Sequence, residues 1–395
     1  MVSLTVAAVA VVTESMRRAL LQSLTELEQL AIDAAFNLTD GHPRQTLTTS
    51  QATIVQRLPV LFAEAAVRPL ADLEYECKES FFSLLGQHSA PIADGRVFSV
   101  YSSSVATMAV AAAFAESGSR VGLLHPTFDN LHDLMNRVLP VVPIEEGLRP
   151  TERVRAAVEG GASVLFLTTP NNPTGQVVNE HELREYVTLC LEYDLTLCLD
   201  TSFRGFDPRA QFDHYSLLES SGVRYIIVED SGKLWPVLEM KLGFVAVSRH
   251  WRKQVEHALS DILLSVSPLV LALVRELSRD SMAGGMQKMQ QLISRNRRIV
   301  SDAVRSLSDV RVLDEEARVS VLRLEFESSD LATEVREELH LTGMHVLPCD
   351  QFHWSDPSQG RRTLRIALSR DESVIQRLVT TLIDVMSSRK LESVA

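Results

Sequence analysis

Residues 163–175 read SVLFLTTPNNPTG, an apolar run of the β-strand type that stops in a turn rich in Pro and Asn. A helical segment follows at residues 181–193. The same alternation extends outward in both directions, from about residue 96 to residue 247. We predict a further helix at residues 105–115, and strands at residues 97–101, 121–124, 163–167, 195–199, 225–228 and 244–247. Strands that alternate with helices predict an α/β fold with a mostly parallel sheet, covered by helices on both faces.

Most of these strands end in a cluster of polar or turn residues. The four clusters are Ser102-Ser103-Ser104, residues 168–172, Asp200-Thr201-Ser202 and residues 229–233. Open parallel sheets bind their ligands at the carboxyl ends of the strands. We therefore expect the four clusters to converge on one site.

The rest of the chain predicts an N-terminal helix and a second, smaller unit. Apolar residues at helical spacing predict a helix at residues 16–36, which turn residues at 40–43 end. A long helical region covers about residues 251–307, with Gly284-Gly285 as its break. Short strands and helices beyond residue 310 indicate a small α+β unit. The predicted parts are an N-terminal helix and loop (1–45) associated with the small domain, a large domain (46–300) and a small C-terminal domain (301–395).

Composition and charge exclude several classes of protein. Of the 395 residues, 45% are hydrophobic and 23% are charged, as in ordinary globular proteins. A net charge of −12 argues against binding to nucleic acid or to an anionic membrane. The four cysteines lack CxxC spacing, which argues against a zinc site and favours reduced thiols. No basic residue precedes the apolar stretch at residues 2–12, as a signal peptide would require, so we expect a cytoplasmic protein.

Three of the clusters hold side chains that suit pyridoxal 5′-phosphate (PLP). Lys233 follows an apolar strand and a small-residue turn, where burial would lower the pKa of its ammonium group and favour a Schiff base. Asp200 would bring a carboxylate that keeps a pyridine nitrogen protonated. Ser103 and Ser104 start a helix and offer hydroxyl and N–H groups to an anion. Taken singly, each has an ordinary alternative: a surface lysine, a turn aspartate and a helix cap.

The segment Asn171-Asn172-Pro173-Thr174-Gly175 resembles a motif of the class I and II aminotransferases, which are PLP enzymes of fold type I. The resemblance covers about residues 95–385 and implies that Asn172 bonds the phenolic oxygen of the cofactor and lies near the substrate. It also implies that Asp200 pairs with the pyridine nitrogen, that Lys233 forms the Schiff base and that Lys241 binds the phosphate. Phe128 would stack on the cofactor ring, and Arg365 would bind the substrate α-carboxylate. Sites of this fold type usually lie at a homodimer interface, so the resemblance implies a homodimer.

Two positions depart from the aminotransferase pattern. Phe203 stands where the family usually has a tyrosine that bonds the cofactor, so Ser202 would have to supply that hydrogen bond. Asp230 stands where a phosphate-binding serine is common, and a carboxylate there would repel the phosphate. We therefore expect Ser231 to serve the phosphate and Asp230 to face a cationic part of the substrate.

These departures and several nearby motifs resemble the PLP-dependent L-arginine oxidases and hydroxylases of natural-product pathways. The motifs are DGHPRQ (40–45), YSSSV (101–105), HPTFDN (125–130), DTSFRGF (200–206), EDSGKLWP (229–236) and QFHW (351–354). The resemblance implies that L-arginine is oxidised by O2 without a metal, with Lys233 taking the α-proton. The implied products are H2O2, ammonia and 4-hydroxy-2-oxo-arginine, with 2-oxo-arginine as a side product. The alternative is an ordinary aminotransferase acting on arginine or another amino acid.

The narrower resemblance also implies that the N-terminal helix closes over the site as a lid. Thr25 and Glu28 fall where substrate contacts are expected, and His42 falls on a histidine needed for the oxidative outcome. Glu28 and Asp230 together would pair the guanidinium of arginine. His42 would act as an acid or base near neutral pH. Without the resemblance, Glu28 reads as part of a solvated helix face and His42 as a turn histidine.

Overall fold

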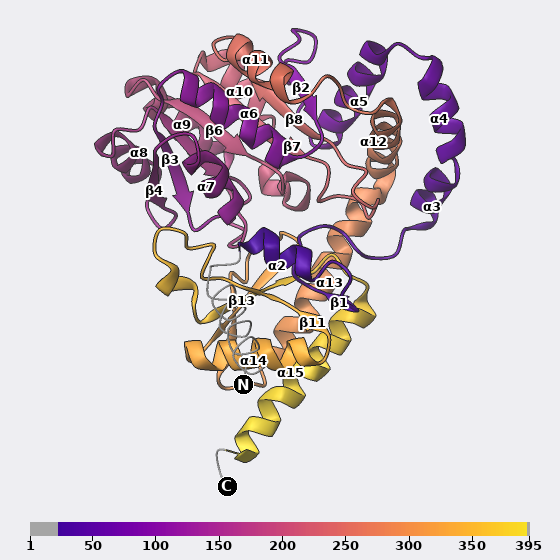
Figure 1. Cartoon of the computed structure of the whole chain (residues 1–395), viewed down its shortest axis with the longest axis vertical. Helices are drawn as coiled ribbons and strands as arrows, with labels where there is room; N and C mark the ends of the chain where they lie inside the picture. The colour runs from indigo at the N-terminus through magenta and orange to yellow at the C-terminus, as the bar shows by residue number, and fades with distance from the viewer. Residues whose placement is uncertain (1–22, 393–395) are drawn as a thin grey trace, which may run out of the picture.

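The structure of the protein is a computed structural model, in which residues 23–392 are described (Figure 1). Two units lie one above the other in this view, with α2 between them. The helices are α2 Leu24–Leu30, α3 Thr49–Gln56, α4 Leu58–Val67, α5 Leu70–Leu84, α6 Ser103–Glu116, α7 Asp129–Asn136, α8 Pro150–Glu159, α9 Glu180–Glu192, α10 His214–Ser221, α11 Arg252–Ile262, α12 Pro268–Asp280, α13 Met286–Val304, α14 Ser329–Leu341 and α15 Glu372–Glu392. The strands are β1 Phe36–Asn37, β2 Val97–Val100, β3 Val121–His125, β4 Val141–Glu145, β5 Val164–Thr168, β6 Thr196–Asp200, β7 Tyr225–Asp230, β8 Gly243–Val247, β9 Val310–Leu313, β10 Val321–Phe326, β11 Met344–His345, β12 Leu347–Pro348 and β13 Thr363–Ala367.

A seven-stranded sheet forms the centre of the larger unit. Its strand order is β2-β8-β7-β6-β5-β3-β4. β8 runs antiparallel to both of its neighbours, and the pairs β7-β6, β6-β5, β5-β3 and β3-β4 are parallel. The mostly parallel sheet predicted from the strand and helix alternation is therefore confirmed. The edge strand β4 was not among the predicted strands.

Both faces of this sheet are buried under helices. Leu197 and Leu199 of β6 belong to one core, and Cys198 between them belongs to the other. Residues of α5, α9, α10 and α12 share the first core, while α6, α7 and α11 share the second. Because successive side chains of a strand point to opposite faces, strands of a doubly covered sheet are apolar throughout. This explains why the strands read as continuous apolar runs.

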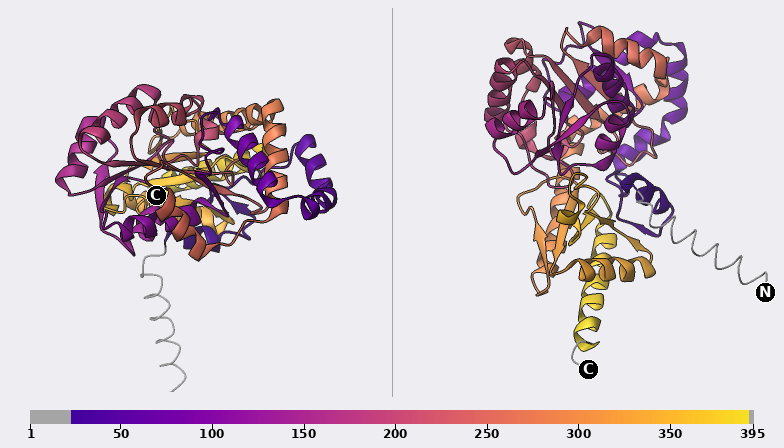
Figure 2. Two further views of the ribbon diagram at one scale, coloured as in Figure 1. Left: turned by 90° about the horizontal axis from the view of Figure 1, so that it is seen from above. Right: turned by 60° about the vertical axis from the view of Figure 1, so that its left-hand side comes forward.

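A four-stranded antiparallel sheet, of order β12-β13-β10-β9, forms the smaller unit with α14 and α15. It lies below the larger unit in the right view of Figure 2, and α13 connects the two. The break expected at Gly284-Gly285 is present, because Gly284 has a φ of 112° in a π-helical turn between α12 and α13. The division of the chain at residues 45 and 300 stays a prediction.

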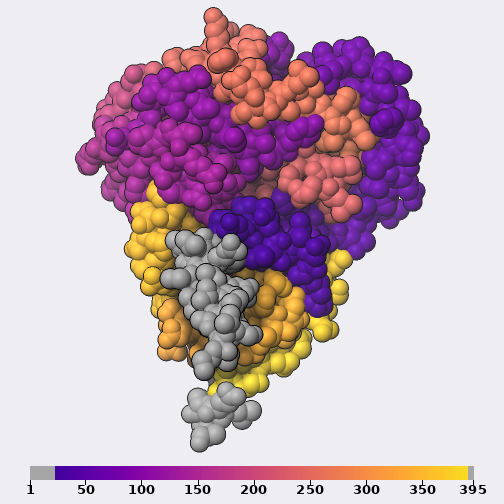
Figure 3. Space-filling model, viewed as in Figure 1, coloured from indigo at the N-terminus to yellow at the C-terminus, as the bar shows by residue number. Residues whose placement is uncertain are grey.

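The helix predicted at residues 16–36 is confirmed at Leu24–Leu30 and is wrong beyond Leu30, and residues 16–22 lie outside the described chain. The helix α2 begins after Ser23, whose hydroxyl accepts from the N–H of Glu26 in a capping box. It ends at Leu30, and Phe36 already belongs to β1, which pairs in parallel with β11. Extended pairing with β11 thus replaces the last turns of the expected helix. On the surface, α2 lies at the junction of the two units (Figure 3).

Candidate active site

The four polar clusters meet around one cavity of about 510 Å³ at the carboxyl ends of the strands. The helix α2 and the loop after β1 supply its opposite wall. Thirteen of the fourteen candidate site residues line it: Thr25, Glu28, His42, Ser103, Ser104, Phe128, Asn172, Asp200, Ser202, Asp230, Lys233, Lys241 and Arg365. Residues from positions 25 to 365 thus share one cavity, as the carboxyl-end rule predicts.

Ser231 is the candidate that the structure does not bring to the cavity. Its side chain is buried, and its Oγ accepts a hydrogen bond from the N–H of Leu242 at 2.8 Å. Its neighbour Asp230 does line the cavity, where its Oδ2 accepts from Ser103 Oγ at 3.1 Å. Asp230 Oδ1 also accepts from the N–H of Gly232 at 2.7 Å. Asp230 therefore supports the turn that carries Lys233 as well as facing the cavity.

The start of α6 presents N–H groups and hydroxyls to the cavity. Ser102 is its N-cap and accepts from the N–H of Val105 at 3.3 Å. Gly243 of β8 passes so close that a Cβ atom there would lie 2.7 Å from the carbonyl carbon of Ser102. Glycine at this position thus brings Lys241, two residues earlier, beside the helix start. A helix N-terminus with a nearby lysine is a suitable site for a phosphate group.

Asp200 lies at the end of β6 with one carboxylate oxygen in use. Its Oδ1 accepts from the N–H and the hydroxyl of Ser202, at 2.9 and 2.6 Å. No group of the described residues bonds its Oδ2. Burial raises the pKa of Asp200 to about 6, although the Ser202 bonds and the charge of Lys233 oppose the rise. A protonated pyridine nitrogen at Oδ2 would supply the charge partner that this buried carboxylate needs.

A buried carboxyl behind the cavity holds the motif at residues 171–175. Glu146 Oε1 accepts from Asn171 Nδ2 and from Thr174 Oγ1, both at 2.7 Å. Gly175 has a φ of 74°, and a Cβ atom there would lie 2.5 Å from that of Ala317. These contacts fix the turn so that Asn172 reaches the cavity. Sequence reasoning missed Glu146, whose only signal is an acidic residue after the strand β4.

Arg365 lies fully buried on β13 and connects three parts of the cavity. Its Nη1 donates to Asn172 Oδ1 at 3.2 Å, and its Nη2 donates to Glu28 Oε1 at 3.2 Å and to the main-chain oxygen of Thr39. Its guanidinium lies 5.3 Å from the ring centre of Phe352. Burial raises the pKa of Glu28, while the charges of Arg365 and Lys233 oppose the rise.

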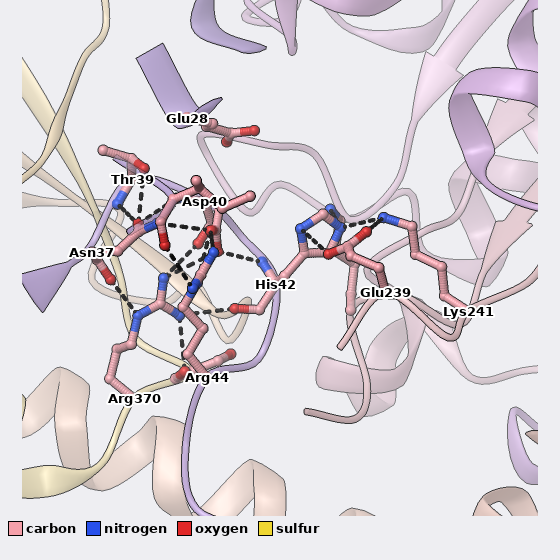
Figure 4. A network of polar contacts seen from close by, with 12 residues as sticks. Glu28, Asn37, Thr39, Asp40, His42, Arg44, Glu239, Lys241 and Arg370 are labelled. Atoms are coloured by element: carbon pink, nitrogen blue, oxygen red, sulfur yellow. Dashed lines mark hydrogen bonds and ion pairs between the residues drawn. The ribbon is translucent and has the colours of Figure 1, made fainter. Parts of the chain in front are cut away.

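His42 points its imidazole at Lys241 and Glu239 (Figure 4). Its Nε2 lies 3.3 Å from Lys233 Nζ and 3.0 Å from Lys241 Nζ. Its Nδ1 lies 3.5 Å from Glu239 Oε1. The charge of Lys233, burial and the charge of Lys241 hold the pKa of His42 well below its usual value. His42 is therefore neutral, and its contacts favour a hydrogen on Nδ1 and a lone pair on Nε2.

Two further residues that sequence reasoning missed hold His42 in place. Arg370 is buried and donates to the main-chain oxygens of Asn37, Asp40 and His42, at 2.6, 3.0 and 2.8 Å. Glu239 contacts His42 from a turn in which its φ is 66°. An arginine beyond a strand and a glutamate in an irregular turn carry no distinctive sequence signal. Both roles depend on contacts across the fold.

Within residues 23–392, no helix is both long enough and apolar enough to cross a bilayer. Over the same range, no group of three or more His, Cys, Asp or Glu residues could hold a metal ion.

The fold and this cavity agree with the comparisons to known proteins. The model of the aminotransferase class I and II family matches residues 68–382, which is most of the chain. The chain belongs to this family, and the resemblance drawn from its motifs is confirmed. The family implies PLP as the cofactor. The lysine, the free carboxylate oxygen of Asp200 and the N–H groups at the start of α6 fit its aldehyde, its ring nitrogen and its phosphate.

Within the family, the chain is a homologue of MppP. A structure of MppP soaked with the product 2-ketoarginine has 44% identity and a TM-score of 0.85, covering 89% of this chain and 99% of that chain. Aspartate aminotransferase from Thermus thermophilus with maleate has 17% identity and a TM-score of 0.73, covering 92% and 97%, and shows the fold alone. Histidinol-phosphate aminotransferase of Symbiobacterium thermophilum is 28% identical over 138 residues, 34% of this chain and 37% of that protein. The chain thus matches little more than a third of this curated relative.

Proposed function

We propose that this protein is a PLP-dependent L-arginine oxidase that forms 4-hydroxy-2-oxo-arginine, with 2-oxo-arginine as a side product. The observation that carries the proposal is the charge pattern of one cavity. Arg365 lines the cavity together with Lys233, and the carboxylates of Glu28 and Asp230 line the same cavity. An arginine molecule needs a cationic partner at its α-carboxylate and anionic partners at its guanidinium. The homology to MppP, soaked with 2-ketoarginine, supports the same substrate class.

Substrate binding would exchange the partners of an existing ion pair. Arg365 now donates to Glu28, so an incoming α-carboxylate would take the place of Glu28 on the guanidinium of Arg365. Glu28 would then be free to bind the guanidinium of the substrate. Each charge keeps a partner during this exchange, which avoids leaving a buried charge uncompensated. Arginine, with opposite charges at its two ends, satisfies both partners at once.

The side chains around Lys233 suit proton transfer on the substrate. Lys233, Asp200, Asn172 and Lys241 would hold PLP, which would supply an electron sink for the electrons of the Cα–H bond. Lys233, freed by the amine of the substrate, would break that bond by taking the α-proton. His42, neutral and 3.3 Å from Lys233 Nζ, accepts a further proton from the substrate side chain or activates a water. Neutrality is required, because only the unprotonated Nε2 is a base.

The overall reaction balances with O2 as the oxidant and water as the source of both new oxygens. For 2-oxo-arginine, arginine loses two electrons to one O2, which becomes H2O2, and water replaces the amine released as ammonia. For the hydroxylated product, a second O2 takes two further electrons and becomes H2O2, and a second water supplies the hydroxyl. The oxygen atoms of O2 therefore end in H2O2 and not in the organic product.

We also propose that the protein acts as a homodimer. Val60, Phe62 and Val67 of α4 expose 49%, 63% and 83% of their surface, which supports an interface at this arm of the large unit. Light scattering on the purified protein would show a mass of twice 43.9 kDa if this is correct.

The function is tested with an oxygen electrode on PLP-saturated protein and L-arginine, without any keto acid. We expect O2 uptake, return of part of the O2 on addition of catalase, and an oxo-arginine that gains one further oxygen by mass spectrometry. In water labelled with ¹⁸O, the hydroxyl should carry the label. Absence of O2 uptake, with pyridoxamine phosphate accumulating, would instead identify an aminotransferase.

A His42→Ala variant separates the roles within this function. It should bind PLP and arginine and still release 2-oxo-arginine, but lose the hydroxylated product, because no base would remain beside Lys233. The exposed residue Asp33, close to α2 but not in the cavity, provides the matched control Asp33→Asn, which should keep both products. Unchanged hydroxylation by His42→Ala would remove His42 from the mechanism.

A further inference from the structure

A second cavity lies at the junction of the two units. It encloses about 640 Å³ and shares no lining residue with the active-site cavity. Its walls come from three segments: the turn at Phe206 and Pro208 after β6, the helix α13, and residues Ala317 and Arg318 between β9 and β10. The proposed oxidation uses none of these residues. The cavity is therefore a candidate for a separate ligand.

Positive charge gathers in this second cavity. Arg295, Arg297, Arg298 and Arg318 line it, and none of its described lining residues is Asp or Glu. The chain as a whole has a net charge of −12, so the cavity reverses the sign of the molecule locally. A concave surface lined by charges of one sign focuses the electrostatic potential and attracts ions of the other sign.

Nearby carboxylates leave most of this charge uncompensated. Arg295 Nε lies 3.8 Å from Glu372 Oε2, a long contact between two side chains that are half exposed. Asp314 is bound by Arg323 at 2.7 and 3.0 Å. Arg298 and Arg318 form no ion pair with any residue from 23 to 392.

Arg297 gives an independent indication of an anionic ligand. Its side chain is buried, with 9% of the residue exposed, and its Nη2 donates to the main-chain oxygens of Val319 and Val321 at 3.0 and 2.6 Å. Its Nε and Nη1 are buried and donate to no group of the described residues. Burial lowers the pKa of Arg297 to about 10, so the guanidinium remains charged at neutral pH. A buried charge without an ionic partner is costly, and an anion in the cavity beside Arg297 would compensate it.

We propose that this cavity binds a small organic phosphate. The planar guanidinium groups of Arg297, Arg298 and Arg318 match the oxygens of a phosphate, which accepts several charge-assisted hydrogen bonds. Phe206 and Ile293 line the same cavity and would contact the organic part. The volume falls within the range of small-molecule sites. Because the ligand would touch both units, binding would also stabilise their junction.

Calorimetric titration with phenyl phosphate tests the proposal on PLP-saturated protein, in which the cofactor occupies the phosphate site at α6. We expect saturable binding with one molecule per chain, and a melting temperature that rises with phenyl phosphate concentration. Benzoate at equal ionic strength, with the same ring and a carboxylate, should bind more weakly. Equal affinity for the two compounds, or no saturable binding at millimolar concentration, would overturn the proposal.

Variants locate the binding in this cavity. The double variant Arg298→Gln and Arg318→Gln removes two exposed cations and should weaken binding by about tenfold or more, without loss of folding. Arg305→Gln is the matched control, because Arg305 is an exposed arginine next to the end of α13 and outside the cavity. This variant should bind phenyl phosphate with unchanged affinity. Unaltered affinity in the double variant would place the phosphate elsewhere and refute the assignment.

Discussion

Glu28 of α2 and Arg365 of β13 meet across the active-site cavity, with 3.2 Å between Glu28 Oε1 and Arg365 Nη2. The two residues are 337 positions apart in the sequence, and their side chains expose only 18% and 1% of their surface. This pair joins the N-terminal helix to the strand that carries the arginine expected to bind the substrate α-carboxylate. In our proposal, substrate binding competes with this ion pair and frees Glu28 for the far end of the substrate.

Replacing Glu28 by Gln should therefore weaken the use of arginine more than the use of uncharged substrates. We expect kcat/KM for L-arginine to fall by about 30-fold, since a buried charge partner contributes about 2 kcal/mol or more. For L-citrulline, which has the same shape without the charge, kcat/KM should fall much less. The measurement is O2 uptake at varied concentrations of both amino acids. Equal losses for both, with Asp33→Asn unaffected, would show that Glu28 does not recognise the guanidinium.

Replacing Glu239 by Gln should shift the product ratio. Glu239 lies 3.5 Å from His42 Nδ1 and favours the tautomer that keeps Nε2 as a base. Loss of such an orienting carboxylate should lower the share of hydroxylated product several-fold, about threefold to tenfold, without abolishing O2 uptake. Product mass spectrometry measures this ratio, and PLP affinity is measured in parallel because Glu239 also contacts Lys241. Glu192→Gln, at the exposed end of α9, is the control. An unchanged product ratio would exclude Glu239 as a positioning residue.

Lys233 and Lys241 should differ in their bonding to PLP although both contact His42. Borohydride treatment of the PLP-bound protein should fix a phosphopyridoxyl group on the peptide that contains Lys233. Lys233→Ala should abolish both the labelling and the reaction. Lys241→Ala should keep the labelling and weaken PLP binding by about tenfold or more, because a phosphate contact is lost. Peptide mass spectrometry decides, and a label on Lys241 would reverse the assignment.

The stability of the PLP-free protein should depend on pH through Asp200. Its pKa rises from 3.8 to about 6 on folding, so the folded state binds the proton more tightly than the unfolded state. The free energy of unfolding therefore falls as the pH rises from about 4 to about 6, by at most about 3 kcal/mol. Water that enters the cavity solvates the carboxylate and makes this loss of stability smaller.

Asp200→Asn cannot ionise and should remove this loss. In urea unfolding of the PLP-free protein, the variant should match the wild type near pH 4 and exceed it at pH 7. Asp129, whose pKa burial also raises to about 6, titrates in the same range, so Asp129→Asn is needed for comparison. A wild type that is more stable than Asp200→Asn at pH 7 without PLP would contradict this prediction.

The sequence predicted those parts of the site that depend on local pattern. Asp200 ends an apolar strand, and Lys233 and Asn172 lie three and four residues beyond the ends of two others. The strands of a parallel sheet bring such positions to one edge. For Ser231, the phosphate role stays a prediction. Sequence spacing placed it near the phosphate, but its hydroxyl bonds the N–H of Leu242 in the turn before β8. Which of two adjacent side chains faces the cavity depends on that turn.

By itself, the sequence determined most strands of the central sheet, the break at Gly284, and the polar residues at the ends of those strands, because backbone preference and the burial of apolar side chains act locally. Only the tertiary structure decided that α2 ends at Leu30, where the chain extends to pair β1 with β11. It also decided that Arg370 holds the loop of His42 and that Glu239 lies beside its Nδ1. These contacts join residues up to hundreds of positions apart, and packing of the two units places them together.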